Sequence, residues 1–181
     1  MADDKISATE LTQLWENPDR HAFAVLDGAS IPTLLDKLYG EDGPNFECLY
    51  RGDLEPDMAE CAPYIAEVER DTDFADWLIG TGWGNHWGIF AVSEAEMKDV
   101  RLHFRKLNMV YGPDGRPLLF RYYDPRVLRI FAPTCSGGDL KKLFGPVERF
   151  VMEAPEPRQG ISLALAGGDL VQQRFLIGRG Q

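Results

Sequence analysis

The chain has 181 residues, of which 44% are hydrophobic and 27% charged, so it can fold as one globular domain with its own core. Its net charge of −10 at pH 7 argues against nonspecific nucleic-acid binding, which depends on clustered Lys and Arg. The sequence lacks apolar runs of signal-peptide or membrane-span length, and its three widely spaced cysteines are an odd number. We therefore expect reduced thiols and a cytoplasmic protein without membrane insertion.

The charge is divided unevenly along the chain. Residues 1–97 hold 21 acidic and 5 basic residues, a net charge of −16, whereas residues 98–181 hold 8 acidic and 14 basic residues, a net charge of +6. Two interpretations stay open. The charges mix on the folded surface, or they form a two-signed surface that orients a protein partner.

The first half of the chain alternates predicted helices and strands. Ser7 and Glu10 form a capping box, followed by Leu11, Leu14 and Trp15 at helical spacing, which predicts a short amphipathic helix. A buried strand, a helix capped by Ser30 and a second strand follow in the segments 22–27, 31–38 and 46–52. This alternation predicts a layered sheet that carries helices.

The middle of the chain continues the pattern. We expect an acidic loop with a short helix, a strand, a helix starting at Asp71 or Thr72, a glycine-rich loop, and an apolar strand, in the segments 53–63, 64–68, 71–79, 80–88 and 88–92. Ser93 and Glu96 then form a second capping box, which starts a helix whose core face carries Met97, Val100, Phe104 and Leu107.

A hairpin is predicted over residues 109–123, with its turn at 112–115. Strand alternation places Tyr122 on one face beside Phe120, and Arg121 on the other face with Tyr123. Asp124 caps a helix that starts at Pro125. A short helix, a strand and a terminal hairpin follow in the segments 139–144, 147–154 and 161–175.

These elements predict an α/β fold, a mixed β-sheet flanked by helices in a single compact domain. Its parts are an N-terminal helix within residues 1–20, the main domain over residues 21–154, and a C-terminal hairpin within residues 155–181 that packs on or extends the domain.

The glycine-rich loop does not fit a phosphate-binding motif. A P-loop leads from a strand into a helix and ends in Lys followed by Ser or Thr, whereas Gly80, Gly82, Gly84 and Gly88 lie between a helix and a strand with no lysine after them. We therefore interpret this loop as a close turn beside Trp83.

The sequence offers weak candidates for catalysis. Cys48 and His86 could form a nucleophile–base pair, but no predicted helix N-terminus or basic neighbour activates the thiol, and a core cysteine is the simpler interpretation. The three histidines are too scattered to predict a zinc site. We expect no catalytic residues, no metal and no cofactor.

The polar cluster Arg121, Tyr122, Tyr123 and Asp124 has two interpretations. As a scaffold, Tyr122 is buried, Asp124 caps the next helix, and Arg121 pairs with an acid from the first half of the chain. As a docking surface, Arg121 and Tyr123 are exposed, and both residue types are favoured at protein interfaces.

The cluster also carries a resemblance to a known family. The segments "AVLDGA", "CLYRG", "DMAECAPYI", "GWGNHWGIF", "GRPLLFRYYDPRVLR" and "FGPVERF" occur in the order found in the DUF4123 family, from about Phe23 to Phe150. Members of that family are regarded as non-catalytic adaptors or chaperones of type VI secretion. They hold a toxic effector in the cytoplasm of a Gram-negative bacterium and help to load it onto a VgrG-type spike protein.

The resemblance, together with the residue types, gives expected roles to residues of this chain. Residues expected to define the fold are Asp27, Gly28, Leu49, Tyr50, Trp77, Gly88, Tyr122, Asp124 and Pro125. Residues expected to contact a partner are Trp83, Trp87, Arg121, Tyr123 and Arg126. The expected partners are an effector and a VgrG-type spike protein.

Two alternative functions stay open. One is a small hydrolase or transferase that uses Cys48 with His86, or Asp124 with Tyr123. The other is an immunity-type protein that neutralises a toxin through its acidic half.

Overall fold

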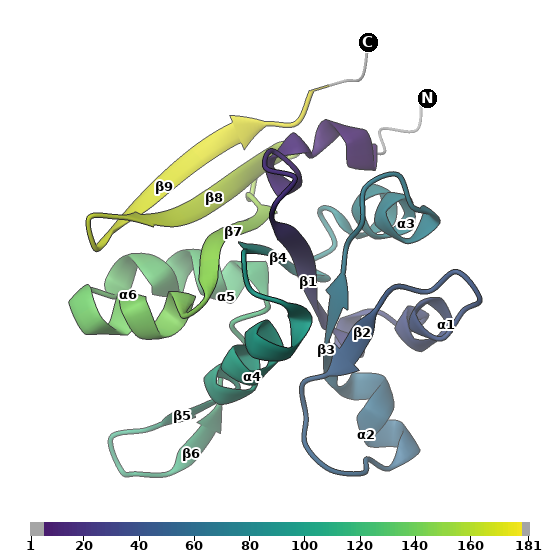
Figure 1. The fold of residues 1–181 in the computed structure, drawn as a ribbon. Coiled ribbons are helices and arrows are strands. Elements are labelled where there is room, and N and C mark those ends of the chain that lie inside the picture. Colours follow the sequence, from purple (N-terminus) through teal and green to yellow (C-terminus); the bar gives the residue numbers. More distant parts are fainter. Residues whose placement is uncertain (1–5, 179–181) are drawn as a thin grey trace.

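A computed structural model describes residues 6–178 as three layers, in which a seven-stranded sheet lies between two layers of helices (Figure 1). The sheet has the order β2-β3-β1-β4-β7-β8-β9 and consists of β1 (His21–Asp27), β2 (Phe46–Cys48), β3 (Pro63–Glu67), β4 (Gly88–Ser93), β7 (Val147–Glu153), β8 (Gln159–Ala166) and β9 (Asp169–Leu176). A separate hairpin pairs β5 (Met109–Tyr111) with β6 (Pro117–Leu119).

Helices cover both faces of the sheet. They are α1 (Leu34–Leu38), α2 (Pro56–Cys61), α3 (Asp73–Gly82), α4 (Met97–Leu107), α5 (Pro125–Phe131) and α6 (Gly137–Phe144). Helices α1 and α3 lie on one side, and α4, α5 and α6 on the other (Figure 1). Within residues 6–178 no helix is long and apolar enough to cross a membrane.

Strand β1 lies in the sheet interior and contributes to both cores. Ala24 and Leu26 face α1 and α3, whereas Phe23 and Val25 face α4, α5 and α6, and all four are at most 1% exposed. Side chains of a strand alternate between its faces, so a strand buried on both sides needs a continuous apolar run. The run in residues 22–26 meets this requirement.

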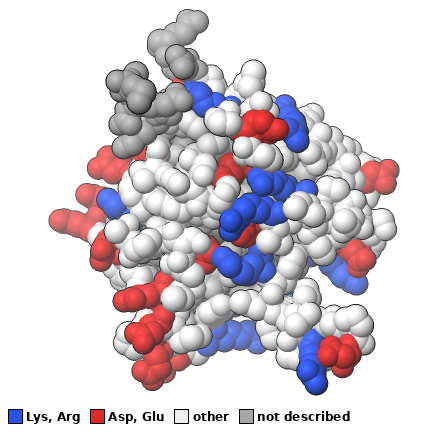
Figure 2. All heavy atoms as spheres, turned by 180° about the vertical axis from the view of Figure 1, so that it is seen from behind, with Lys and Arg blue, Asp and Glu red and all other residues white. Residues whose placement is uncertain are grey.

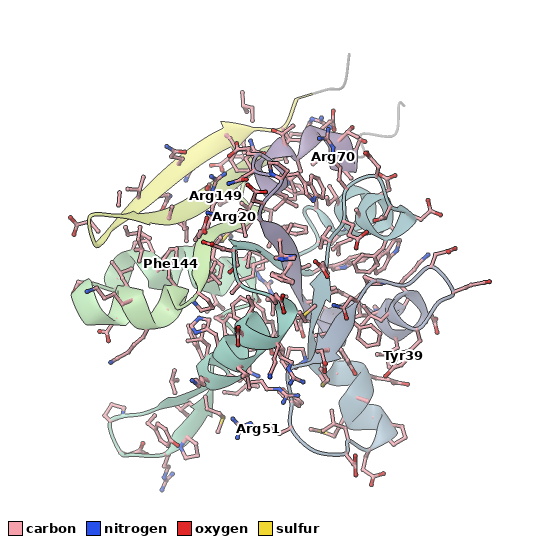
Figure 3. All side chains as sticks on the ribbon, in the orientation of Figure 1. Arg20, Tyr39, Arg51, Arg70, Phe144 and Arg149 are labelled. Carbon is pink, nitrogen blue, oxygen red and sulfur yellow. The ribbon has the colours of Figure 1, made fainter. Side chains whose placement is uncertain are left out.

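Aromatic side chains fill the second core, on the side of α4, α5 and α6. Phe104 of α4 stacks on Tyr122 with ring centroids 5.5 Å apart. Phe144 lies between α6 and the sheet (Figure 3), where its ring meets Phe150 edge-on at 5.0 Å. Such pairs contribute beyond the area they bury, so this core fixes the position of α4 and α6 on the sheet.

The predicted α/β class, with helices flanking a sheet in a single compact domain, is confirmed. The strands expected in the segments from residue 22 to residue 175 form, and so do the helices between them. The sheet differs from the expected mixed arrangement in one detail, because all strand pairs in residues 6–178 are antiparallel.

The N-terminal segment does not form the expected α-helix. The capping box of Ser7 and Glu10 is present, but it opens two 3₁₀ turns, Ala8–Glu10 and Thr12–Leu14. Leu11 and Leu14 are nevertheless buried, because the turns pack onto the sheet. Residues 1–5 of this predicted element lie outside the described residues.

Polar contacts hold this N-terminal segment against the sheet. The indole N–H of Trp15 donates to the carbonyl of Val68 at 3.0 Å. Arg149 of β7 binds Glu16 at 2.6 Å, and nearby Arg20 binds Glu148 (Figure 3). Tertiary contacts, more than local helix propensity, therefore decide the conformation of residues 6–20.

Two expected helix caps have other roles. Ser30 lies in a 3₁₀ turn and donates its hydroxyl to Asp27 at 2.7 Å, while α1 begins after Thr33. Ser93 is the last residue of β4 and donates to the carbonyl of Pro146 at 2.7 Å, so that Glu96 occupies the N-cap position of α4. The helices form as predicted, but their caps were placed too early in the sequence.

The hairpin β5–β6 is shorter than predicted. Its turn closes as expected, with the amide of Gly115 donating to the carbonyl of Gly112 at 2.9 Å. The ladder ends at Leu119, however, and the following residues leave the strand conformation. Tyr122 and Tyr123 are therefore both buried, in contrast to the alternation expected from the sequence.

The C-terminal hairpin is formed by β8 and β9, which pair from Gln159 with Leu176 to Ala166 with Asp169 around the predicted glycine turn. It extends the sheet beyond β7. Residues 179–181 of the predicted C-terminal element lie outside the described residues.

A prediction concerns Gly88, at the closest approach of β4 to β1. A Cβ atom there would lie 2.1 Å from the carbonyl oxygen of Val25, a backbone atom that cannot rotate away. We expect Gly88→Ala to lower the free energy of unfolding by at least about 2 kcal/mol in urea titrations. The control Gly138→Ala, in α6 with nothing within 4 Å of the new Cβ, should raise it by about 0.5 kcal/mol. Equal effects of the two substitutions would contradict the close packing.

Candidate functional site

A buried carboxylate ends strand β1. Asp27 is 2% exposed, and its side chain accepts hydrogen bonds from the amide of Ala29 at 3.2 Å and from the hydroxyl of Ser30. Gly28 follows directly, and only glycine fits because a Cβ atom would lie 2.4 Å from the carbonyl oxygen of Ala62. A buried carboxylate needs a cationic partner as well as neutral donors.

Arg121 supplies that cation from 94 residues away in the sequence. Its guanidinium donates to the carboxylate of Asp27, while 44% of the Arg121 side chain remains exposed. Burial by itself would lower the pKa of Arg121, but the charge of Asp27, its hydrogen bond and the nearby Tyr123 and Asp124 together outweigh burial and raise that pKa. The expectation that Arg121 pairs with an acid from the first half of the chain is confirmed.

The two tyrosines after Arg121 are part of the core. Tyr122 is fully buried beside Phe120, as expected, and its hydroxyl donates to the carbonyl of Phe104 at 3.1 Å. Tyr123, expected on a partner-binding surface, is 2% exposed. Burial, together with the nearby Tyr50 and the charge of Asp27, raises the pKa of Tyr123 to about 12. Tyr123 is therefore neutral at physiological pH and belongs to the scaffold.

Asp124 caps α5, as predicted. Its carboxylate accepts the backbone N–H of Arg126 at 2.9 Å and two bonds from the Arg126 guanidinium, at 3.0 and 2.7 Å. Burial would raise the pKa of Asp124, but the hydrogen bonds and charge of Arg126 outweigh burial and hold it below its ordinary value. The hydrolase interpretation uses Asp124 and Tyr123 as a reactive pair. The carboxylate oxygens of Asp124 already accept hydrogen bonds, however, and Tyr123 stays neutral at physiological pH, so neither group favours this interpretation.

A third buried carboxylate, Glu153 at the end of β7, was not predicted from the sequence. It is 4% exposed and accepts the amide of Gly84 at 2.6 Å, the amide of His86 and the Nδ1 atom of the His86 ring. These bonds hold the loop between α3 and β4, where His86 has a positive φ of 59°. An acidic residue inside the apolar run "FVMEA" was the signal for this role.

Aromatic residues surround this loop. Trp83 stacks on Phe90 with ring centroids 6.4 Å apart, and Trp87 lies against Trp77 at 5.1 Å. Gly82, in the last turn of α3, makes room for the Trp87 ring, which would lie 2.7 Å from a Cβ atom. Both tryptophans predicted to contact a partner are half-buried and packed on the first core. Their exposed edges remain accessible.

The other predicted site residues divide into exposed and buried side chains. Arg121 and Arg126 are the exposed members of the set expected to bind a partner. Leu49, Tyr122 and Pro125 are buried, as residues that define the fold should be. The structure also shows how Leu49 is held, since the buried Asn108 donates to its carbonyl at 3.1 Å.

The Cys48–His86 pair is not assembled. Strands β3 and β1 lie between β2, which ends at Cys48, and β4, which follows His86. Three strand spacings separate β2 from β4, roughly 14 Å. Burial raises the pKa of Cys48, the opposite of what a nucleophilic thiol requires. Across residues 6–178 no group of three His, Cys, Asp or Glu side chains is placed to hold a metal ion.

Apolar side chains are exposed on the hairpin β5–β6 and at the end of α5. They are Met109, Val110, Tyr111, Leu118, Leu119, Ile130 and Phe131, between 36% and 74% exposed. Contiguous exposed apolar side chains are uncommon on soluble monomers and mark binding surfaces. Strand alternation predicted one buried face for this hairpin, so its exposure was not anticipated from the sequence.

Surface charge follows the division found in the sequence. Figure 2 shows acidic side chains along the edge of the molecule formed by α1, α2 and α3, and basic side chains gathered near the middle of the face. Exposed acids on the first side include Asp36, Glu41, Asp42, Glu55, Asp57, Asp73 and Asp76. The folded surface is therefore two-signed, which favours the second of the two interpretations of the charge division.

A first prediction tests the buried ion pair. Arg121→Met leaves the buried Asp27 with neutral donors only and should lower the free energy of unfolding by about 1–3 kcal/mol. Arg126→Met is the matched comparison, because Asp124 is also buried but keeps the backbone N–H of residue 126, and its partner lies only two residues away; its cost should be smaller, about 1 kcal/mol. Urea unfolding at neutral pH measures both. An equal loss of stability in the two variants would contradict a larger contribution of the Asp27–Arg121 pair to the free energy of unfolding.

A second prediction tests thiol chemistry. Burial raises the pKa of Cys48 and of Cys135 above the ordinary thiol value, so at neutral pH the thiolate fraction of each is below that of a free cysteine. Alkylation by iodoacetamide, followed at each site by mass spectrometry, should be slow near pH 7 and accelerate as the pH rises through about 9. Fast alkylation of either thiol near pH 6 would instead support the hydrolase alternative.

The comparisons with known proteins bear on the same residues. A family model described as "Domain of unknown function (DUF4123)" matches residues 22–142, which run from β1 into α6 and include Asp27, Arg121 and Asp124. No curated protein and no solved structure matches the sequence. The chain therefore belongs to the DUF4123 family.

Proposed function

We propose that the protein is a non-catalytic adaptor that holds a type VI secretion effector in the cytoplasm and helps to load it onto a VgrG-type spike protein. Membership of the DUF4123 family supports this proposal, together with the resemblance of its "GRPLLFRYYDPRVLR" block to that of adaptors in the family.

The state of the polar cluster supports a binding role over catalysis. The carboxylates of Asp27, Asp124 and Glu153 each accept several hydrogen bonds from neighbouring groups. Catalytic groups need a free lone pair or proton within reach of a substrate. Here the donors and acceptors are used to fix loops and helix ends.

The observation that carries the proposal is the exposed apolar surface of β5–β6 and α5. A folded chain with a net charge of −10 and well-buried cores leaves a group of large apolar side chains in solvent at this end. Binding of a partner that covers exposed apolar area of this kind removes it from water and lowers the free energy of the system. A chaperone that shields apolar effector surface before export requires such a region.

The acidic side of the molecule offers a second, chemically different surface. Two partners can then bind at the same time, the effector at one surface and the spike at the other. Holding both raises their effective concentration relative to each other without any covalent step. This arrangement accounts for loading without turnover.

The test is a pull-down of the full chain, affinity-tagged, from the cytoplasm of its native bacterium under secretion conditions. We expect an effector and a VgrG-type spike protein to copurify, identified by mass spectrometry. Recovery of neither, while both are expressed, would contradict the proposal.

A complementation assay tests for thiol catalysis in the same cells. A chain in which Cys48, Cys61 and Cys135 are all replaced by serine should restore effector secretion to a deletion strain as well as the wild type does, since no step uses a thiol. Loss of secretion by a folded triple variant would favour the cysteine-hydrolase alternative.

A further inference from the structure

We propose that a groove between α4, the hairpin β5–β6, α5 and α6 binds an amphipathic helix of the effector, apolar on one face and bordered by Asp and Glu. This inference rests on the adaptor function and names the site and the chemistry of the segment it would recognise.

The groove has a volume of about 630 Å³ and an apolar floor. The end of α4 and the start of β5 contribute Leu107, Met109 and Val110. Phe120 and Phe131 close the floor, with their rings edge-on at 4.7 Å. Met109 is 47% exposed and Phe131 36% exposed, so this part of the floor is open to solvent, while Leu107 and Phe120 pack against the second core beneath it.

Helix α6 forms the other wall. Gly145 ends this helix with a positive φ of 50°, and the His103 ring of α4 lies against it, 2.4 Å from where a Cβ atom would be. The Nε2–H of His103 donates to the carbonyl of Leu143 at 3.0 Å. Burial lowers the pKa of His103, so this ring is neutral and the charge of the groove comes from other residues.

Lysines border the groove on both sides. Lys106 lies on α4, and Lys141 and Lys142 lie on α6. Asp139 neutralises Lys142 at 3.4 Å, whereas Lys106 and Lys141 form no ion pair with any described residue. A basic rim around an apolar floor is complementary to a helix that carries acidic residues beside an apolar stripe.

A helix fits the walls better than an added strand does. The groove is lined largely by helices, and helices bind apolar grooves through side chains spaced at i, i+3, i+4 and i+7. Acidic residues next to that stripe would face Lys106 on one side and Lys141 on the other.

Two other occupants fit less well. In a symmetric pair of chains this patch would face itself, which brings lysine rims of the same sign together. The described chain begins at Ile6 and ends at Gly178, both at the opposite end of the molecule from the hairpin (Figure 1), so neither described end reaches the groove.

The first test uses a synthetic probe, a fluorescent helical peptide of about 18 residues with a leucine stripe flanked by glutamates. Its counterpart carries lysines in place of the glutamates. Fluorescence anisotropy with the full chain should give saturable binding of the glutamate peptide, at least about tenfold tighter than the lysine peptide and weakened by salt. Absence of saturable binding, or equal binding of both peptides, would overturn the proposal.

Matched variants locate the binding. Met109→Asp places a charge on the floor and should weaken the glutamate peptide at least about tenfold. Met58→Asp is the control, since Met58 is similarly exposed, at 51%, but lies on α2. Lys141→Glu should also weaken binding, and Lys98→Glu, outside the groove, should change it less than about twofold. Equal effects within either pair would refute the assignment, and circular dichroism confirms that each variant is folded.

Two cysteines provide an internal footprint of the complex with a copurified effector. Cys135 lines the groove, whereas Cys61 is exposed on α2. We expect the effector to slow maleimide labelling of Cys135 and to leave Cys61 unchanged. If the effector is recovered but Cys135 labels as before and Met109→Asp still captures it, the groove assignment is wrong and the adaptor function stands.

The opposite pattern is equally informative. Tight, Met109-dependent peptide binding without recovery of effector or spike supports the groove and contradicts the adaptor function. Sedimentation identifies the remaining alternative, because a dimer that Met109→Asp dissociates would show that a second copy occupies the groove and would overturn the proposal.

Discussion

A carboxylate buried at the end of the central strand needs a cation, and this requirement organises one end of the molecule. Asp27 leaves the sheet where β1 meets β3 and β4, in a region that water barely reaches. Neutral donors from the following turn satisfy part of its hydrogen-bonding capacity, and Arg121 supplies the charge. Because Arg121 belongs to a distant segment, the ion pair fixes where that segment crosses the end of the sheet.

The position of Arg121 determines the course of the chain on both sides of this residue. Tyr122 and Tyr123 enter the second core, and Asp124 starts α5 with a fixed direction. Before Arg121, the hairpin β5–β6 projects away from the sheet (Figure 1). The tyrosines after Arg121 are therefore buried, whereas Met109, Val110 and their neighbours before it lie in solvent.

The division between internally paired polar groups and uncovered apolar groups is what one expects of a recognition protein. The polar motif residues stabilise loops and helix ends, so their hydrogen bonds contribute to the stability of the fold. In the proposed adaptor function, recognition depends on the surfaces that the scaffold leaves open. These are an apolar groove with a basic rim and an acidic side formed by α1, α2 and α3, which together give the molecule two chemically distinct ends.

Elements whose signals are local can be predicted from the amino-acid sequence. The apolar run of β1, the Thr72 and Asp124 caps, the core face of α4 and both glycine turns need only neighbouring residues to be specified. For Arg121 the sequence left two interpretations open, a pair with an unspecified acid or an exposed docking residue. Tertiary structure decided that Asp27 is the partner, that Glu153 holds the glycine loop, that Tyr123 is buried, and that the hairpin stays exposed. Each of these depends on residues far apart in the chain, and burial is a property of the packed molecule that the alternation within one strand does not specify.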